Sequence, residues 1–398
     1  MAGPPIRAQD QRGTMIPTLY IGRRAIGPSA PCYIIAEMSA NHCHSFDKAV
    51  EIIRAASDAG ADAVKLQTYT PDTITIDCAN EYFQIGKGTI WEGKNLYQLY
   101  GEACTPWDWQ PKLKTVADEL GLDCFSSPFD CSAVDFLEKM NVPAHKIASF
   151  ELVDLALIRK VAQTGKPVIM STGMATLAEI DEAVRTLRAA GCNQLALLKC
   201  TSAYPSPPEE MNLCTIPHLA EAFGVPAGLS DHTLGIAVPV AAVALGACII
   251  EKHFTLRRSD GGPDAAFSLE PAEFKAMVDA IRIAEKALGR VNYEVTEKEK
   301  ASRVFRRSLF VVKDMKAGEV FTKESVRSIR PGYGLAPRYL DQVIGLVASR
   351  DIERGTPLSW DLVSATGHTP VIAAANQRSA SSDSKDKGDD AKPSWKKK

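Results

Sequence analysis

The chain alternates short apolar runs with longer stretches in which apolar residues recur at the helical period. Eight of the runs are rich in β-branched and aliphatic residues, as expected of parallel strands buried on both faces. The stretches between them suit amphipathic crossover helices. The predicted strands are residues 33–39, 63–68, 123–128, 146–151, 168–172, 195–201, 227–232 and 248–254, and the predicted helices include 47–59, 109–120, 132–140, 177–190, 238–245 and 274–288.

Eight strand–helix units are the number that closes a barrel of parallel strands. The pattern therefore predicts an α/β protein with a TIM (β/α)8 barrel over residues 16–290. A charged linker is expected at 291–305 and a small, mostly β domain at 306–366. We expect the polar segments 1–15 and 367–398 to be disordered. The second unit carries a long insertion at 69–105, where a barrel commonly places substrate specificity. A plain surface loop is the alternative for this insertion.

Composition narrows the class of protein. The 46 Lys and Arg nearly balance the 48 Asp and Glu, so we expect neither nucleic acid nor an anionic membrane as a partner. We find no apolar run of membrane-spanning length and no secretory signal, which predicts a soluble, cytoplasmic protein. The ten cysteines form no CxxC pair and are expected to be reduced thiols.

Histidines stand at the ends of the last two predicted strands. Side chains at the carboxyl ends of barrel strands converge on one mouth, so His232 and His253 are candidates to bind one divalent metal ion. Glu251 precedes His253 by two residues and is expected to point the same way. Each histidine taken alone is more commonly a hydrogen-bonded core residue, and that alternative stays open.

Two lysines lie within predicted buried strands, where an unpaired charge costs several kcal/mol. Lys65 and Lys146 therefore need anionic partners, either a substrate or a carboxylate. Together with the hydroxyls that close neighbouring strands, they suit a pocket for phosphate and carboxylate groups. A structural ion pair is the alternative for each. Glu37 and Glu251 are candidate acid or base groups, and spacing does not separate their roles.

The strand ends, taken in order, resemble those of a known family. The segments 35–42, 65–68, 146–151 and 171–174, with the histidine segments 228–233 and 250–254, are similar to those of the sialic acid synthases. The resemblance covers residues 16–363. It implies a barrel enzyme with a C-terminal antifreeze-like (SAF) domain that condenses phosphoenolpyruvate with an amino sugar.

Further detail resembles one branch of that family. Segments 65–73, 91–97, 105–107 and 200–205 are similar to the branch that uses 2,4-diacetamido-2,4,6-trideoxy-L-altrose and makes a nonulosonic acid. Ser202 and Ala265 stand where the N-acetylneuraminate branch has Asn and His. Synthesis of N-acetylneuraminate or legionaminate is the alternative within the family, and a non-catalytic carbohydrate-binding or ice-binding protein is a remote one.

The resemblance also implies a role for each site residue. His232 and His253 would hold Mn2+ or Mg2+. Glu37, Tyr204, Glu251 and Asp264 would be catalytic groups that handle the sugar and water. Arg330 of the small domain would reach the sugar's N-acyl group in a partner's barrel, which implies a domain-swapped homodimer. The implied substrate-binding residues in the barrel are Lys65, Gln67, Ser126, Lys146, Ser149, Ser171, Ser202 and Ser230.

Overall fold

The computed structural model describes residues 16–86 and 91–365. The segments predicted to be disordered, 1–15 and 367–398, lie outside the described residues. The described chain divides between Val291 and Asn292 into two compact units. Each unit is described by itself below.

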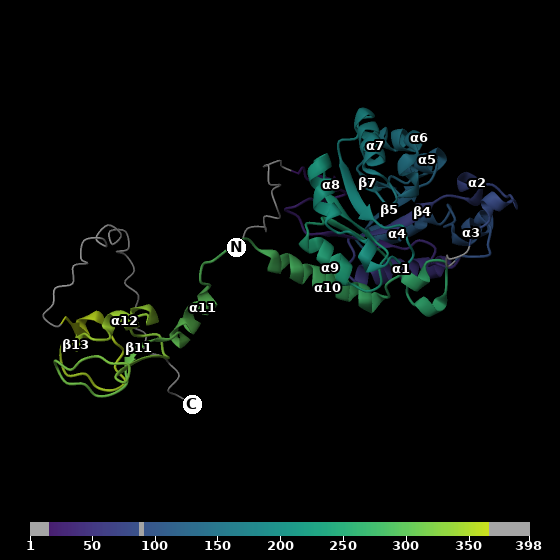
Figure 1. Cartoon of the computed structure of the whole chain (residues 1–398). Helices are drawn as coiled ribbons and strands as arrows, with labels where there is room; N and C mark the ends of the chain where they lie inside the picture. Colours follow the sequence, from purple (N-terminus) through teal and green to yellow (C-terminus); the bar gives the residue numbers. More distant parts are fainter. Residues whose placement is uncertain (1–15, 87–90, 366–398) are drawn as a thin grey trace. The chain divides into compact units, whose positions relative to one another are not determined.

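The first unit is built on a closed barrel of eight parallel strands in the order β10-β3-β4-β5-β6-β7-β8-β9, which confirms the predicted barrel (Figure 1). Sequential strands are neighbours, and β10 closes the ring against β3. The strands are β3 (Tyr33–Glu37), β4 (Ala63–Thr68), β5 (Asp123–Pro128), β6 (His145–Ile147), β7 (Val168–Ser171), β8 (Leu195–Cys200), β9 (Ala227–Asp231) and β10 (Ile249–His253).

Helices connect the strands and cover the outside of the barrel. Their starts are marked by side-chain caps: Ser45 accepts a hydrogen bond from the Lys48 amide at the start of the first helix, and Thr176 with Glu179 forms a capping box. The helices of this unit are α1 (Phe46–Asp58), α2 (Pro71–Ile74), α3 (Leu96–Ala103), α4 (Gln110–Glu119), α5 (Cys131–Lys139), α6 (Leu155–Ala162), α7 (Leu177–Ala189), α8 (Thr215–Phe223), α9 (Ala237–Ala244) and α10 (Pro271–Leu288).

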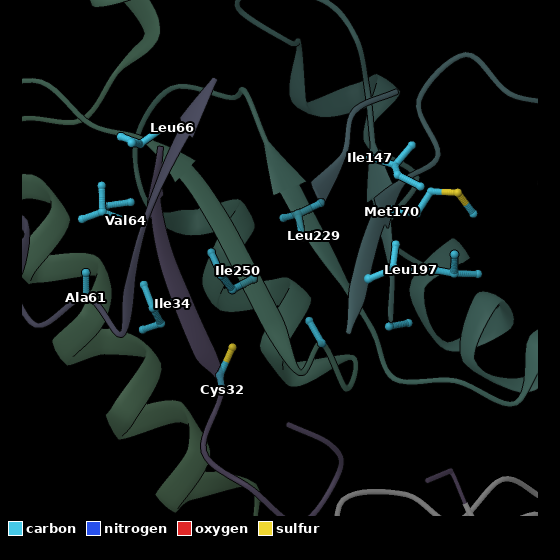
Figure 2. Close-up of a cluster of buried hydrophobic side chains, with 14 of the residues drawn as sticks. Cys32, Ile34, Ala61, Val64, Leu66, Ile147, Met170, Leu197, Leu229 and Ile250 are labelled. Carbon is cyan, nitrogen blue, oxygen red and sulfur yellow. The ribbon is translucent and has the colours of Figure 1, made fainter. Parts of the chain in front are cut away.

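Side chains alternate strictly between the two faces of the barrel wall. Outward residues such as Ile34, Val64, Leu229 and Ile250 pack with the helices in the largest apolar cluster (Figure 2). Inward residues form a second cluster toward the amino ends of the strands, and it includes side chains of the antiparallel hairpin β1 (Leu19–Ile21) and β2 (Arg24–Ile26). The hairpin fills this end, so the polar inward positions gather at the opposite, carboxyl end.

The insertion between β4 and α4 is not a plain loop. It contains α2 and α3, which contact each other, and a capping box at Asn95 and Gln98 starts α3. Its residues 87–90 lie outside the described part. The insertion therefore presents helical faces beside the carboxyl end of the barrel.

The second unit is small and has its own apolar core around Leu309, Phe321 and Leu358. It contains two antiparallel strand pairs and two short helices, which agrees with the predicted small, mostly β domain. The elements are β11 (Ser308–Val311), β12 (Val326–Ile329), β13 (Val347–Ala348), β14 (Val363–Ser364), α11 (Glu297–Ser302) and α12 (Leu340–Val343).

In the described chain, no helix combines the length and apolarity that crossing a membrane requires. The cysteines, all of which are described, are free thiols.

A buried ion pair lies on the outward face of the last two strands. Lys252 Nζ is 2.5 Å from Asp231 Oδ2, and both side chains are fully buried. Asp231 also accepts hydrogen bonds from the Thr233 amide and hydroxyl at 3.0 and 3.1 Å. The pair thus joins β9 to β10 next to both strand-end histidines.

Removing one partner of this pair leaves the other charge buried and unpaired. We expect Lys252→Met to lower the free energy of unfolding by about 3–5 kcal/mol. Thermal unfolding of the full chain measures the effect. Arg350→Met, which removes an exposed ion pair to Asp361, is the control and should change stability little. A Lys252→Met protein that melts with the parent would contradict this account of the pair.

Candidate active site

Lys65 is the centre of a buried charge cluster at the carboxyl end of the barrel. Its ammonium lies 3.0 Å from Glu37 Oε2 and 3.1 Å from Glu251 Oε1. The same Glu251 oxygen is 3.8 Å from Lys146 Nζ and accepts a hydrogen bond from Ser230 Oγ at 3.0 Å. All four charged side chains are almost completely buried. The lysines therefore have carboxylate partners. A carboxylate is one of the two kinds of anionic partner that the sequence analysis expected for them.

The ionisation of the cluster is uneven. Burial raises the pKa of Glu37 to about 7, against the opposing effect of Lys65. Burial acts in the same direction on Glu251, but the two ammonium groups outweigh it and hold its pKa below the usual range. Near neutral pH the two lysines therefore face the ionised carboxylate of Glu251 and a Glu37 carboxyl group whose raised pKa favours its protonated form. This excess of positive charge suits an anionic ligand.

Lys146 faces a group of hydroxyls. Its ammonium donates to Ser171 Oγ at 2.7 Å, and burial lowers its pKa to about 8. On the neighbouring loop the Gly173 amide donates to Ser149 Oγ at 3.2 Å. A Cβ atom at Gly173 would lie 2.4 Å from Ser202 Oγ, so only glycine lets these hydroxyls approach. Three predicted substrate-binding serines, at positions 149, 171 and 202, thus lie around Lys146 and Gly173.

Ser126 points away from the inside of the barrel. Its hydroxyl lies 2.6 Å from Thr68 Oγ1, which in turn donates to Gln110 of α4 on the helix-covered side of the wall. The next residue, Ser127, lies two positions after the inward Phe125 and so shares its face, and its buried Oγ has no hydrogen-bond partner among the described residues. The structure therefore places Ser126 on the helix-covered side of the wall, and its role in substrate binding stays a prediction.

The two histidines lie together at the mouth, with ring centroids 5.3 Å apart. His232 Nδ1 is 3.0 Å from the Thr201 carbonyl, so it acts as the donor there and leaves Nε2 available as a ligand. Burial lowers the pKa of His253 well below its usual value, which keeps the imidazole neutral, and its buried Nδ1 has no hydrogen-bond partner among the described residues. Burial acts to lower the pKa of His232, but its interactions with Cys200 and the Thr201 carbonyl outweigh burial and raise that pKa. In its deprotonated form Nε2 of His232, together with the neutral His253, is a suitable ligand for a divalent metal ion.

The remaining predicted catalytic groups surround the histidines. Asp264 Oδ2 is 3.9 Å from His253 Nδ1 and accepts a short hydrogen bond from Ser39. Burial raises the pKa of Asp264. Tyr204 packs on His232, with ring centroids 4.4 Å apart. Within the described residues no group of three His, Cys, Asp or Glu side chains is arranged to hold a metal by itself. Water or substrate oxygens would have to complete the coordination.

A cavity of about 450 Å³ opens above these groups, within the range of small-molecule sites. Its polar lining includes Ser39, Gln67 and Glu151. Gln67 donates to Glu37 at 3.1 Å and to Ser39 at 2.9 Å, so it joins the cavity to the charge cluster.

Glu151 is a residue that the sequence prediction left out of the site. It lies on the short helix η2 (Phe150–Val153) after β6. Its buried Oε2 has no hydrogen-bond partner in the described structure, and burial raises its pKa to about 7. The sequence feature that could have indicated it is its place at the end of the predicted strand 146–151.

Arg330 follows β12 in the second unit and is exposed. Its approach to the sugar stays a prediction.

The comparisons with known proteins agree with this geometry. The sequence matches the NeuB family over residues 52–293 and the SAF domain over residues 306–364. It is 48% identical over 326 residues to a protein named pseudaminic acid synthase from Campylobacter jejuni subsp. jejuni serotype O:23/36 (strain 81-176), and this match covers 82% of the chain and 95% of the relative. It is 46% identical over 335 residues to a protein of the same name from Helicobacter pylori (strain ATCC 700392 / 26695), covering 83% and 97%.

A solved structure gives the same picture. The N-acetylneuraminic acid (sialic acid) synthetase of Leptospira borgpetersenii serovar Hardjo-bovis is 32% identical, with a TM-score of 0.64. The match covers 72% of this chain and 95% of that one.

We call the group of polar side chains around Lys65 and Lys146 the anion cradle. Neighbouring serines on opposite faces of β5 allow a direct test of it. We expect Ser127→Ala to weaken binding of inorganic phosphate about tenfold, because a hydrogen bond to a charged group contributes about 1.5–3 kcal/mol. Isothermal titration calorimetry measures the affinity. Ser126→Ala is the matched control, and it should lower the melting temperature while leaving the phosphate affinity unchanged. If Ser126→Ala weakens phosphate binding more than Ser127→Ala, the assignment of inward and outward faces is wrong.

Proposed function

The chain belongs to the NeuB family and carries a SAF domain, and from this membership we propose that it is a pseudaminic acid synthase. It condenses phosphoenolpyruvate with 2,4-diacetamido-2,4,6-trideoxy-L-altrose and water, giving a nonulosonic acid and phosphate. The single observation that carries the proposal is the arrangement of Lys65 and Lys146 around Glu251 beside the His232–His253 pair. This arrangement places the anion cradle beside the histidine pair that would hold a metal ion, and both lie at the carboxyl end of the barrel.

The cradle holds phosphoenolpyruvate. Lys65 and Lys146 attract the phosphate and carboxylate groups, and the hydroxyls of Ser127, Ser149 and Ser171 donate to their oxygens. Glu251, which accepts a hydrogen bond from Ser230, keeps the two ammonium groups in place. We therefore assign Ser230 and Glu251 to positioning the lysines rather than to direct contact with the anion. Preorganised donors of this kind each contribute about 3–4 kcal/mol to stabilising charge in a transition state.

The reaction forms one carbon–carbon bond and breaks one carbon–oxygen bond. C3 of phosphoenolpyruvate attacks the aldehyde carbon of the open-chain sugar, whose oxygen takes a proton. Water then adds to C2 and loses one proton. The hydroxyl group so formed gives its proton to the leaving phosphate as the C2–O bond to phosphate breaks and the C2 ketone forms. Glu37 and Glu151, with pKa values raised to about 7, are suited to donate or accept a proton at neutral pH.

Asp264 is the better candidate than Glu251 to take the proton from water. Burial raises the pKa of Asp264, and it faces His253 at the cavity, whereas two lysines hold the pKa of Glu251 low and make it a weak base. Tyr204 stacks on His232 and forms a wall for the sugar. Gln67 lines the cavity and is placed to bind the sugar's hydroxyl and amide groups. Ser202, beside Gly173, is the further serine that we assign to the sugar.

His232 and His253 would hold the divalent metal ion, Mn2+ or Mg2+. When bound there, such an ion supplies Lewis-acid polarisation of the sugar's carbonyl oxygen. The protein contributes the fixed tautomer of His232 and the neutral state of His253. The lowered pKa of His253 favours metal binding over protonation at that residue.

The proposal includes an assembly and a location. Two copies form a domain-swapped homodimer in which Arg330 of one copy reaches the sugar's N-acyl group in the other copy's barrel. The free thiols of all ten cysteines support a reducing, cytoplasmic compartment.

The function is tested with purified full-length protein, phosphoenolpyruvate and one sugar at a time. We expect phosphate release to be fastest with the trideoxy-altrose, and mass spectrometry to show the matching nonulosonic acid. Lys65→Met should abolish release, while Lys112→Met, an exposed lysine of α4, should not. Faster release with N-acetylmannosamine or with the legionaminate precursor would move the assignment to those synthases. No release with any sugar would return the chain to a carbohydrate-binding or ice-binding role.

Metal removal is tested by binding as well as by activity. We expect the chelator-treated protein to be inactive and to bind one Mn2+ per chain, measured by electron paramagnetic resonance. His253→Ala should weaken this binding at least tenfold. His218→Ala, which removes an exposed histidine of α8, is the matched control and should not. Full activity of the metal-free protein would contradict the two-histidine site.

A further inference from the structure

The loop between β3 and α1 has a strained backbone at the edge of the cavity. Within residues 38–45, Ser39, Cys43 and His44 have φ angles of 45°, 48° and 53°. This left-handed region is unfavourable for residues that carry a Cβ atom, so the surroundings must hold the loop in this shape. Strain of this kind collects at functional sites, and the contacts of the loop are therefore candidates for a role in the reaction.

Ser39 is the buried member of the three, with 2% of its surface exposed, and it lines the cavity. Its Oγ accepts a hydrogen bond from Gln67 Nε2 at 2.9 Å. Because an amide nitrogen can only donate, the single proton of the Ser39 hydroxyl points at Asp264 Oδ2, with which it makes a short hydrogen bond. The direction of this hydrogen bond is thus fixed by Gln67.

The backbone of the loop adds a second donor to the same carboxylate. The amide of Ala40 donates a hydrogen bond to Asp264. Both donors depend on the backbone angles at Ser39, because its Cβ carries the hydroxyl and its carbonyl carbon is bonded to the Ala40 nitrogen. The strained conformation at Ser39 therefore brings a hydroxyl and an amide to one carboxylate.

Asn41 ties the loop to the segment that carries Asp264. Its side chain is fully buried, and its Nδ2 donates to the Phe254 carbonyl and to Ser268 Oγ, both at 2.9 Å. Ser268 Oγ in turn donates to the Asp264 carbonyl at 2.6 Å. The loop thus holds the main chain of Asp264 through Asn41 and its carboxylate through Ser39.

These contacts fix the direction of the Asp264 carboxylate, which lies beside His253 at the cavity. We propose that Ser39 is a positioning residue that holds this carboxylate in the orientation in which it accepts the proton of the attacking water. The inference rests on the proposed function, in which Asp264 is that base. Ser39 acts through Asp264 and makes no bond to the reacting atoms.

Removal of the hydroxyl should slow the reaction without weakening substrate binding. Proton transfer by a positioned group contributes about 100- to 10,000-fold to a rate, and a misplacement of about 1 Å costs about 100-fold. We expect Ser39→Ala to lower kcat for phosphate release about 10- to 100-fold, with KM for phosphoenolpyruvate and for the sugar within about twofold of the parent values. Ser132→Ala is the matched control, because it removes an exposed hydroxyl that donates to Asp130 at 2.6 Å, and it should keep the parent kcat.

A double variant separates a positioning role from a structural one. If Ser39 acts only through Asp264, Ser39→Ala should lower kcat no further when Asp264→Asn is already present, whereas a general structural defect would lower kcat in both backgrounds alike. Ser39→Gly removes the same hydroxyl and suits the positive φ angle, so it serves in place of Ser39→Ala if that variant fails to fold. It should show the same loss of kcat.

The outcomes distinguish the two proposals. A parent kcat in the folded Ser39 variants, a raised KM for the sugar with unchanged kcat, or an equal loss in the Asp264→Asn background would each overturn the positioning role and leave the synthase function standing. Absence of phosphate release by the parent protein with every sugar would overturn the function itself.

Discussion

The shared ion pairing of Lys65 with Glu37 and Glu251 is the interaction on which the site depends. Closure of the barrel sets His253 beside Glu37, and Glu37 beside Lys65, in the register of neighbouring strands. Each of these residues points inward, so a buried ammonium meets two buried carboxyl groups at close range. The desolvation cost of these charges is offset within the cluster and by the anion that it binds.

The rest of the barrel keeps this cluster in place. On the outward face, the Lys252–Asp231 pair joins the two strands that carry the histidines. At the amino ends of the strands, the β1–β2 hairpin and inward apolar side chains pack together and fill the barrel. The polar inward side chains therefore gather at the carboxyl end, where the insertion contributes apolar side chains to the lining of the cavity.

Much of the site was predictable because strand periodicity and strand ends are sequence properties. Lys65, Glu251, His232 and His253 were found from their places in apolar runs, and they do converge. The outward direction of Ser126 was not predictable, since two adjacent serines look alike until the inward direction of Phe125 fixes the face of each. Glu151 was left out because its role depends on burial of one oxygen in a cavity, which no local pattern records.

The sequence by itself determined the eightfold strand–helix order, the small second domain and the family, because each follows from periodicity or from motifs within a short segment. Only the tertiary structure decided in which direction the pKa of each carboxyl group shifts, which of the two adjacent serines points inward and which residues of the insertion line the cavity. Those properties arise from burial and from distances between residues far apart in the chain, such as Gln67 and Glu37 or Leu99 and His253. Electrostatics and desolvation act through space, and they appear only when the barrel closes.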